Sequence, residues 1–383
     1  MPKYKVCKHT KNYDELVKAL KANGIEFETK NCIKKCSKCR SQILIQKDDD
    51  YISAKTIEKL LSKLVVKASP QQYIIYGAMG LGGDWAKDQP ITEKHLEEAT
   101  LALNTAIECG ITFFDLADIY KAGKSETVFG HYLKANPTIR EKIIIQSKVG
   151  IRLTGAPFGS RFDFSYSHII ESVDGILSRL CTDYLDILLL HRPDPLMDRD
   201  ELKRAIDKLF KEGKIRALGV SNMDYHQIQL IEAYTGRKIV ANQLELSLLK
   251  TDFVCNTVGF NNSVGDNLNF PLGTLEYCML NNVNIQSWSP LARGIYSGRP
   301  LDENTPKTIS NTKEIVERIA KDRNVSTDGV VLAWLMKHPA KINPVIGTTN
   351  PERIRNAMDA FKIQLTRDEW YELLVASKGV SMP

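Results

Sequence analysis

Eight short apolar runs alternate with helix-like segments along most of this 383-residue chain. Each run is rich in β-branched residues and bounded by polar or turn residues, which is typical of parallel strands buried on both faces. The runs cover residues 74–83, 111–114, 142–147, 185–190, 215–220, 239–242, 284–287 and 342–346. This alternation predicts an α/β fold, and eight units predict a closed (β/α)8 TIM barrel. A doubly wound open sheet is the alternative, but no G-x-G-x-x-G motif follows the first run.

Four polar residues stand at or just after the ends of these runs: Asp115, Tyr120, Lys148 and His191. In a βα barrel the carboxyl ends of the strands converge on one mouth, where such folds carry out their chemistry. The simpler interpretation is that these residues only cap strands and satisfy loop backbone. Because the four side chains can divide one reaction among them, we favour an active site.

One reaction that suits these four residues is the reduction of a carbonyl by hydride transfer, which leaves negative charge on oxygen and therefore needs a proton donor beside it. Tyr120 can donate the proton if a neighbouring ammonium lowers its pKa from the usual value of about 10. Lys148 can supply that charge, and Asp115 can hold the lysine in place and keep it protonated. His191 can hydrogen-bond the substrate oxygen and orient it.

Several short motifs follow the predicted strands in a fixed order. They are F-D at 114–115 with Tyr120 five residues on, S-K at 147–148, L-H-R-P-D at 190–194, G-V-S-N at 219–222, N-Q at 242–243 and W-S-P-L at 288–291. On these motifs, residues from about 73 to the C-terminus resemble an aldo-keto reductase. The resemblance implies that the protein is an enzyme that reduces a small-molecule aldehyde or ketone with NADPH. It also implies catalytic roles for the four residues named above.

The same resemblance implies a set of cofactor contacts. Ser221, Asn222 and Gln243 match residues that hydrogen-bond the nicotinamide carboxamide, and Trp288 matches the aromatic residue on which the nicotinamide ring stacks. The remaining predicted contacts are Ser289, Leu291, Gly347, Thr348, Thr349, Arg353 and Asn356. The last five residues of this list suit the phosphate end of the cofactor. Hydroxyls and an arginine there favour NADPH, with NADH as the alternative.

Charge separates a front segment from the rest of the chain. Residues 1–69 carry 16 Lys+Arg against 8 Asp+Glu, while the remainder has 36 against 38. The shift, together with Ser69-Pro70, predicts two domains, 1–69 and 70–383. The front lysines lack interleaved aromatic residues, which argues against nucleic-acid binding. No window is apolar enough to span a membrane and no signal segment begins the chain, so we expect a cytoplasmic protein.

The front domain is predicted to be a small thioredoxin-like α/β unit. Its order is strand (5–7), helix (13–22), strand (26–29), cysteine loop, hairpin (43–45 and 51–52) and helix (54–64). Its four cysteines are Cys7, Cys32, Cys36 and Cys39. Their spacing resembles a small thioredoxin-like bacterial family of unknown function and, more loosely, the thioredoxin-like ferredoxins.

Three interpretations of these cysteines stay open. All four can bind zinc or a [2Fe-2S] cluster. Cys36 and Cys39 can instead cycle as a disulfide with a redox protein partner, helped by nearby lysines. They can also be inert thiols, as we expect for the four cysteines beyond residue 100.

A second function for the whole protein is a nicotinamide-binding redox sensor that signals through the cysteine domain. An intact Tyr120 argues against it, because a sensor has no need of a proton donor. Two rim loops are also predicted: a Gly/Pro-containing loop at 152–161, and a loop at 250–270 that is rich in Asn, Gly and Ser and shows no helical period. The second can cover the cofactor or shape the substrate pocket, with disorder as the alternative. Phe158 and Phe162, in and beside the first loop, could line a substrate cleft.

Overall fold

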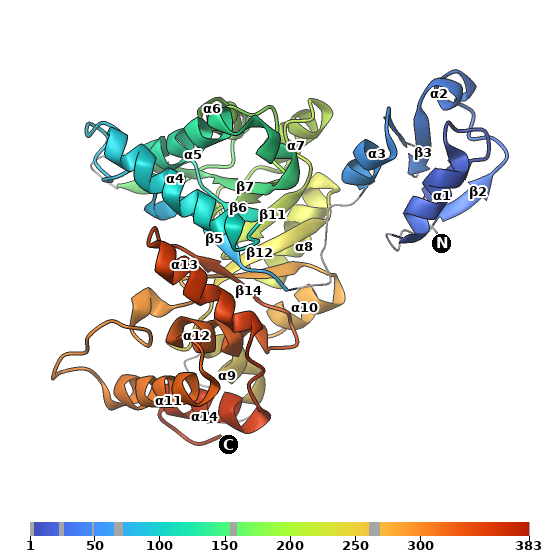
Figure 1. The fold of residues 1–383 in the computed structure, drawn as a ribbon. Helices are drawn as coiled ribbons and strands as arrows, with labels where there is room; N and C mark the ends of the chain where they lie inside the picture. Colours follow the sequence, from blue (N-terminus) through green and yellow to red (C-terminus); the bar gives the residue numbers. More distant parts are fainter. Residues whose placement is uncertain are drawn as a thin grey trace. The chain divides into compact units, whose positions relative to one another are not determined.

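The computed structural model describes residues 4–22, 27–47, 50–64, 72–153, 159–259 and 269–382. The chain divides into two compact units, Met1–Ser69 and Pro70–Pro383, and we describe each by itself (Figure 1). In the described ranges no helix is both long enough and apolar enough to cross a lipid bilayer.

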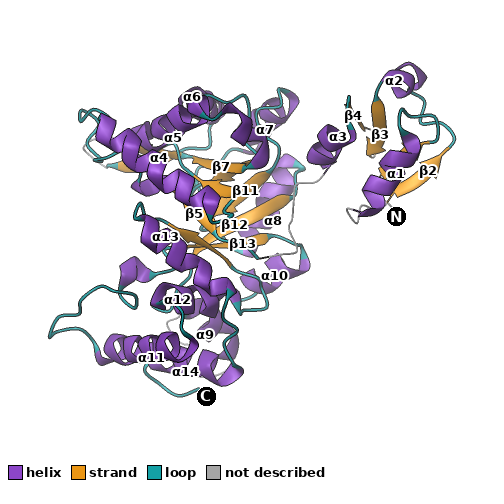
Figure 2. Ribbon diagram, viewed as in Figure 1, coloured by secondary structure: helices purple, strands orange, loops and turns teal. Residues whose placement is uncertain are grey.

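The larger unit is built on a closed barrel of eight strands, all paired in parallel (Figure 2). The strands are β5 (Ile75–Gly77), β6 (Phe113–Asp115), β7 (Ile144–Val149), β10 (Ile187–Leu190), β11 (Leu218–Ser221), β12 (Ile239–Glu245), β13 (Asn284–Trp288) and β14 (Asn343–Ile346). The predicted TIM barrel is confirmed, and the open sheet is ruled out because β10 and β7 close the ring.

Helices follow the strands and pack on the outside of the barrel or on one another, and their apolar faces share one core (Figure 1). They are α4 (Glu93–Glu108), α5 (Lys124–Ala135), α6 (Tyr166–Leu180), α7 (Arg199–Lys211), α8 (Tyr225–Thr235), α9 (Asp252–Val258), α10 (Thr274–Leu280), α11 (Lys307–Arg323), α12 (Thr327–Met336), α13 (Pro351–Ala357) and α14 (Arg367–Lys378). Local sequence explains the starts: Thr92 caps α4 in a capping box, and Asn350 caps α13 with proline at its first position.

The barrel interior is layered because side chains alternate along each strand. One end is filled by apolar side chains that include Ile75, Phe113 and Leu189. Two residues further along β6, on the same face as Phe113, comes Asp115. The polar side chains of the interior therefore lie toward the carboxyl ends of the strands, at the mouth where barrel enzymes act.

Both predicted rim loops contain more structure than expected. The first carries an antiparallel pair, β8 (Ile151–Leu153) and β9 (Ser160–Phe162); Phe162 is exposed, and Phe158 lies outside the described residues. The second begins with α9, so the expectation of no helix there was wrong. The reason is tertiary: Phe253 in α9 is buried against Trp334, a contact that local periodicity does not reveal.

The smaller unit is a mixed four-stranded sheet in the order β2-β1-β3-β4. Its elements are β1 (Tyr4–Cys7), α1 (Tyr13–Ala22), β2 (Phe27–Lys30), α2 (Cys36–Ser41), β3 (Ile43–Lys47), β4 (Asp50–Ala54) and α3 (Ile57–Leu64). β1 and β2 are parallel, whereas β3 pairs antiparallel with both β1 and β4. The expected cysteine loop contains the short helix α2.

Candidate active site

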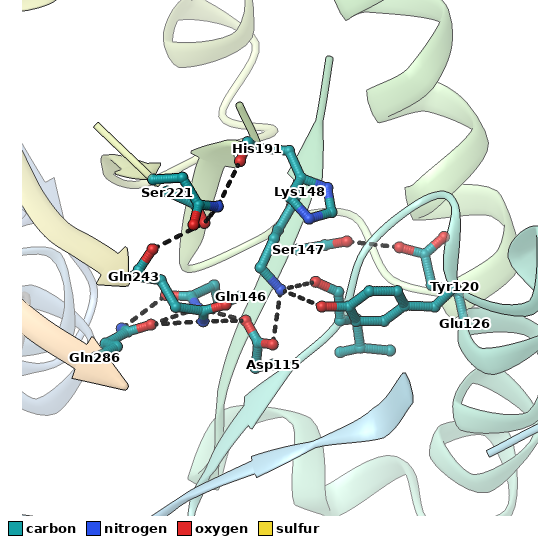
Figure 3. A network of polar contacts seen from close by, with 12 residues as sticks. Asp115, Tyr120, Glu126, Gln146, Ser147, Lys148, His191, Ser221, Gln243 and Gln286 are labelled. Carbon is teal, nitrogen blue, oxygen red and sulfur yellow. Dashed lines mark hydrogen bonds and ion pairs between the residues drawn. The ribbon is translucent and has the colours of Figure 1, made fainter. Parts of the chain in front are cut away.

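A buried ion pair forms the floor of the barrel mouth (Figure 3). Asp115 ends β6 and Lys148 lies in β7, the neighbouring strand. The Nζ atom of Lys148 lies 2.7 Å from Oδ2 of Asp115, and both side chains are almost fully buried. The ammonium also donates to the carbonyl oxygen of Leu116 at 2.8 Å and to the hydroxyl of Tyr120 at 3.0 Å. Three acceptors thus satisfy its three N–H groups.

Amide side chains hold the other oxygen of the carboxylate. Gln146 and Gln243 each donate from Nε2 to Oδ1 of Asp115, at 2.6 and 2.9 Å. Both also donate to Oε1 of Gln286, at 2.8 and 3.0 Å, so three neighbouring amides lock one another. We did not predict roles for Gln146 and Gln286. Period-two alternation contains the signal for Gln146, since it shares a strand face with Lys148 two residues on.

The pKa values follow from burial and from this ion pair. Burial lowers the pKa of Lys148, but the charge of Asp115 outweighs it, so the net pKa is raised and the lysine stays cationic. Burial raises the pKa of Tyr120; the Lys148 ammonium acts in the opposite direction without reversing the shift, and the Asp115 charge adds to it. Our expectation of a lowered pKa was therefore wrong in its net direction. A phenol with a raised pKa keeps its proton at neutral pH, as a proton donor must.

His191 follows β10 and faces Tyr120 edge to face, with ring centroids 6.2 Å apart. Burial lowers its pKa well below the usual value, and the charges of Lys148 and Arg192 lower it further. The imidazole is therefore neutral at physiological pH. Its buried Nδ1 atom has no hydrogen-bond partner among the described residues. A buried polar atom without a partner is costly, and such atoms occur mainly at functional or strained sites.

The predicted nicotinamide contacts are linked to one another at the ends of β11, β12 and β13. Ser221 donates to the carbonyl oxygen of Gln243 at 2.9 Å, and Asn222 donates to Ser221 at 2.8 Å. The indole N–H of Trp288 donates to Oδ1 of Asn222 at 3.0 Å. Asn222 and Ser289 have left-handed backbone conformations, with φ of 58° and 51°. Such strain is common where a fold presents side chains to a ligand.

A cavity of about 420 Å³ opens at this mouth. Most of the predicted site residues line it: Asp115, Tyr120, His191, Ser221, Asn222, Gln243, Trp288, Ser289, Leu291, Gly347, Thr348 and Arg353. Lys148 lies beneath it, and its ammonium bonds two of the lining residues, Asp115 and Tyr120. Thr349 and Asn356 are not among the lining residues. The volume falls in the range of ligand-binding pockets, roughly 300–1,000 Å³.

The residues at the start of α13, which we expected to bind the cofactor phosphate, already have partners within the protein. The first backbone amides of α13, those of Glu352 and Arg353, already donate to Oδ1 of Asn350 at 2.8 and 3.3 Å. They are therefore not free to bind an anion. The guanidinium of Arg353 pairs with Asp328 at 3.3 Å and still lines the cavity. Gly294 lies beside it, where an added Cβ would come within 3.2 Å of the guanidinium.

The cavity also has lining residues that we did not predict, including Met79, Arg192 and Arg293. Arg192 lies within the L-H-R-P-D motif and Arg293 lies two residues beyond W-S-P-L, which was the available signal. Both are cationic, so they make the rim positive. A positive rim favours anionic groups in whatever the cavity binds.

The four cysteines of the smaller unit differ in exposure. The sulfurs of Cys32 and Cys36 are 3.6 Å apart and exposed, whereas Cys7 and Cys39 are buried. Within the described residues, no group of three or more His, Cys, Asp or Glu side chains is arranged to hold a metal ion. The prediction of zinc or a [2Fe-2S] cluster at Cys7, Cys32, Cys36 and Cys39 thus gains no support from this geometry.

A phenol held 3.0 Å from a buried ammonium at the mouth of a parallel barrel suits proton transfer, and it places the protein in the class of barrel enzymes that act at the carboxyl ends of their strands. Comparison with known proteins narrows this class. Residues 73–376 match the Aldo/keto reductase family. The chain belongs to that family and is an NAD(P)H-dependent oxidoreductase.

Individual relatives agree with this assignment. The chain is 37% identical to a 6-dehydroglucose reductase from Agrobacterium fabrum over 311 residues, covering 80% of this chain and 94% of that protein. It is also 37% identical to the uncharacterized oxidoreductase YcsN of Bacillus subtilis, over 72% of this chain and 87% of the relative. Among solved structures, the thermostable aldo-keto reductase Tm1743 superposes with a TM-score of 0.62 at 26% identity, covering 81% of this chain and 97% of that one. The family model begins at residue 73, beyond the smaller unit.

Proposed function

We propose that the barrel reduces an aldehyde or ketone to an alcohol with NADPH, with Tyr120 as the proton donor. The observation that carries the proposal is the 3.0 Å contact between the Tyr120 hydroxyl and the Lys148 ammonium at the edge of the cavity. The contact ties the phenol to a fixed positive charge that stabilises the phenolate left after proton transfer. Asp115 is a positioning residue, because it acts through Lys148.

His191 supplies the second contact to the substrate oxygen. Its neutral ring carries one N–H, which can donate to a carbonyl oxygen placed beside Tyr120. Two donors converging on one oxygen orient the carbonyl and favour the charge that develops on it.

The residues present fit a nicotinamide cofactor. Ser221, Asn222 and Gln243 present polar groups to the cavity, and Trp288 presents a ring at its wall. The cofactor, when bound, supplies the hydride. Arg353 and Thr348 would meet its phosphate end, and the cationic Arg353 is our reason for favouring NADPH over NADH.

The test is turnover of NADPH by the full-length protein against a panel of aldehydes and ketones. We place 6-dehydroglucose first because a relative 37% identical carries that name. We expect Tyr120→Phe to lower kcat by roughly 100- to 10,000-fold while leaving NADPH affinity unchanged. The matched control is Tyr132→Phe, which removes a buried hydroxyl that bonds Asn104 away from the cavity. Tight NADPH binding without any turnover would instead favour the nicotinamide sensor.

For the smaller unit we keep the prediction of a thioredoxin-like domain with a redox protein partner. The mixed sheet, its order and its flanking helices support the fold part of that prediction. Zinc or a [2Fe-2S] cluster stays a prediction, tested by metal analysis and the visible absorbance spectrum of protein purified without oxygen. We also expect the protein to act in the cytoplasm.

A further inference from the structure

The cysteines of the smaller unit differ sharply in access. Cys32 and Cys36 are exposed, and their sulfurs lie 3.6 Å apart. A disulfide bond is about 2.05 Å long, so the two sulfurs need to approach by only about 1.5 Å. Rotation of two exposed side chains about their own bonds can supply such a movement without displacing packed neighbours.

The other two cysteines, Cys7 and Cys39, are buried. Cys7 and Cys39 are each 2% exposed and share an apolar cluster with Ile33 and Leu44. Burial, followed by a hydrogen bond with Cys7, raises the pKa of Cys39 to about 12. The thiolate is the nucleophile in exchange, so Cys39 is both inaccessible and unreactive. The Cys36-Ser-Lys-Cys39 pairing suggested by sequence spacing therefore does not suit the structure.

The backbone around Cys32 favours its thiolate. Lys34 has a left-handed conformation, with φ of 61°, and its backbone N–H donates to the sulfur of Cys32 at 3.3 Å. The charge of Lys34 acts in the same direction. The hydrogen bond between the two thiols makes them unequal: it lowers the pKa of Cys32 and raises that of Cys36. Unequal thiols suit a division into an attacking and a resolving cysteine.

We infer that Cys32 and Cys36 form a redox-active dithiol that reduces the disulfide of a partner molecule. The thiolate of Cys32 attacks one sulfur of that disulfide, forms a mixed disulfide and releases the other sulfur as a thiolate. Cys36 loses its proton and attacks the sulfur of Cys32, which releases the second thiolate of the partner. Two electrons pass to the partner, which becomes a dithiol, and the Cys32–Cys36 disulfide remains.

The experiment exposes the full-length reduced protein to graded mixtures of glutathione and glutathione disulfide, followed by alkylation, trypsin digestion and mass spectrometry. Lys34 and Lys35 separate Cys32 from Cys36, and Lys38 separates Cys36 from Cys39, so each possible disulfide gives a distinct peptide pair. We expect a Cys32–Cys36 disulfide, with Cys7 and Cys39 alkylated only after unfolding.

Two cysteine variants test the roles assigned to Cys32 and Cys36. Cys36→Ser should trap glutathione on Cys32, because the resolving thiol is gone. The matched control is Cys181→Ser, which removes another exposed cysteine from the barrel unit and should leave the Cys32–Cys36 disulfide unchanged. A Cys36–Cys39 disulfide, no intramolecular disulfide at the most oxidising ratio, or stoichiometric zinc or iron protecting all four thiols would each overturn the inference. None of these readouts depends on the barrel's activity.

Discussion

At the scale of single residues, the buried Asp115–Lys148 pair carries a large electrostatic cost. Removing two charges from water is expensive, and only complete hydrogen bonding offsets it. Here the ammonium has three acceptors, and both carboxylate oxygens accept hydrogen bonds. The pair therefore holds the Tyr120 hydroxyl in one place.

Removing one partner of this ion pair should lower the free energy of unfolding more than replacing both partners. We expect Lys148→Met to lower the free energy of unfolding by about 3–5 kcal/mol, because it leaves the Asp115 carboxylate buried without its partner. The double variant Asp115→Asn with Lys148→Met should recover part of that stability. Neither variant should turn over substrate. Urea unfolding and steady-state kinetics measure both effects, and equal stability of Lys148→Met and wild type would contradict the argument.

A second buried carboxyl predicts how stability changes with pH. Burial, reinforced by the charge of Glu126, raises the pKa of Asp118 to about 7, and its Oδ1 has no hydrogen-bond partner among the described residues. The native state therefore holds a proton that the unfolded state releases from about pH 4 upward. The contribution of Asp118 to stability is present at low pH and falls as pH rises toward 7, by up to about 4 kcal/mol.

Replacement of this carboxyl should flatten that dependence. We expect Asp118→Asn to gain stability relative to wild type as pH rises from 5 to 7.5, measured by urea unfolding at each pH. The exposed residue Asp88 offers the control variant Asp88→Asn, which should follow wild type. An Asp118→Asn curve parallel to that of wild type would show that the carboxyl is already ionised in the native state.

At the scale of elements, the strands position the buried Asp115–Lys148 pair, and the loops position the side chains around the mouth of the cavity. Strand alternation puts Asp115 and Lys148 inside the barrel, where neighbours must satisfy them. The loops bend sharply: Lys121 and Ala122 after Tyr120, like Arg293 after β13, have left-handed conformations. The strands thus hold the buried side chains in fixed positions. The loops, which contain the strained residues, shape the entrance of the cavity.

Helix α13 offers a test of cofactor preference at this scale. We expect Arg353→Leu to raise the KM for NADPH by roughly 10- to 100-fold with little effect on NADH, because a charge-assisted hydrogen bond contributes about 1.5–3 kcal/mol. Arg355→Leu is the matched control, since this arginine lies in the same helix, is exposed and does not line the cavity. Equal losses with both cofactors would assign Arg353 to helix packing through Asp328 instead.

At the scale of the whole molecule, two units have separate apolar cores. The smaller unit packs around Val6, Leu16 and Ile43, and the barrel has its own clusters inside and outside the ring of strands. A unit with its own core can fold by itself. Activity and thiol chemistry then belong to different units of one chain.

This division predicts the behaviour of a truncated protein. We expect a fragment of residues 70–383 to fold and to keep the kcat and KM of the full chain within about twofold, because the cavity-lining residues that the structure describes all belong to the barrel unit. Circular dichroism and steady-state kinetics provide the measurement. A fragment that folds but loses turnover would mean that the smaller unit contributes to the reaction.

Much of the barrel was predictable, because its signal is local and repeated. Each strand is an apolar run followed by polar residues, and eight such units leave few alternatives to a closed ring. That Asp115, Tyr120, Lys148 and His191 share one mouth follows from the same repetition. Packing between distant segments was not predictable in this way: α9 is a helix because Phe253 meets Trp334 some 80 residues further along the chain.

The sequence by itself determined the repeat, the strand ends and the residue types available for chemistry, since these depend on neighbours along the chain. Only the tertiary structure decided which amides hold Asp115 and in which direction the Tyr120 pKa moves. It also decided that the sulfur of Cys32 lies beside that of Cys36 while Cys39 is buried. These properties depend on burial and on partners from other elements. Both arise only when distant segments of the chain pack together.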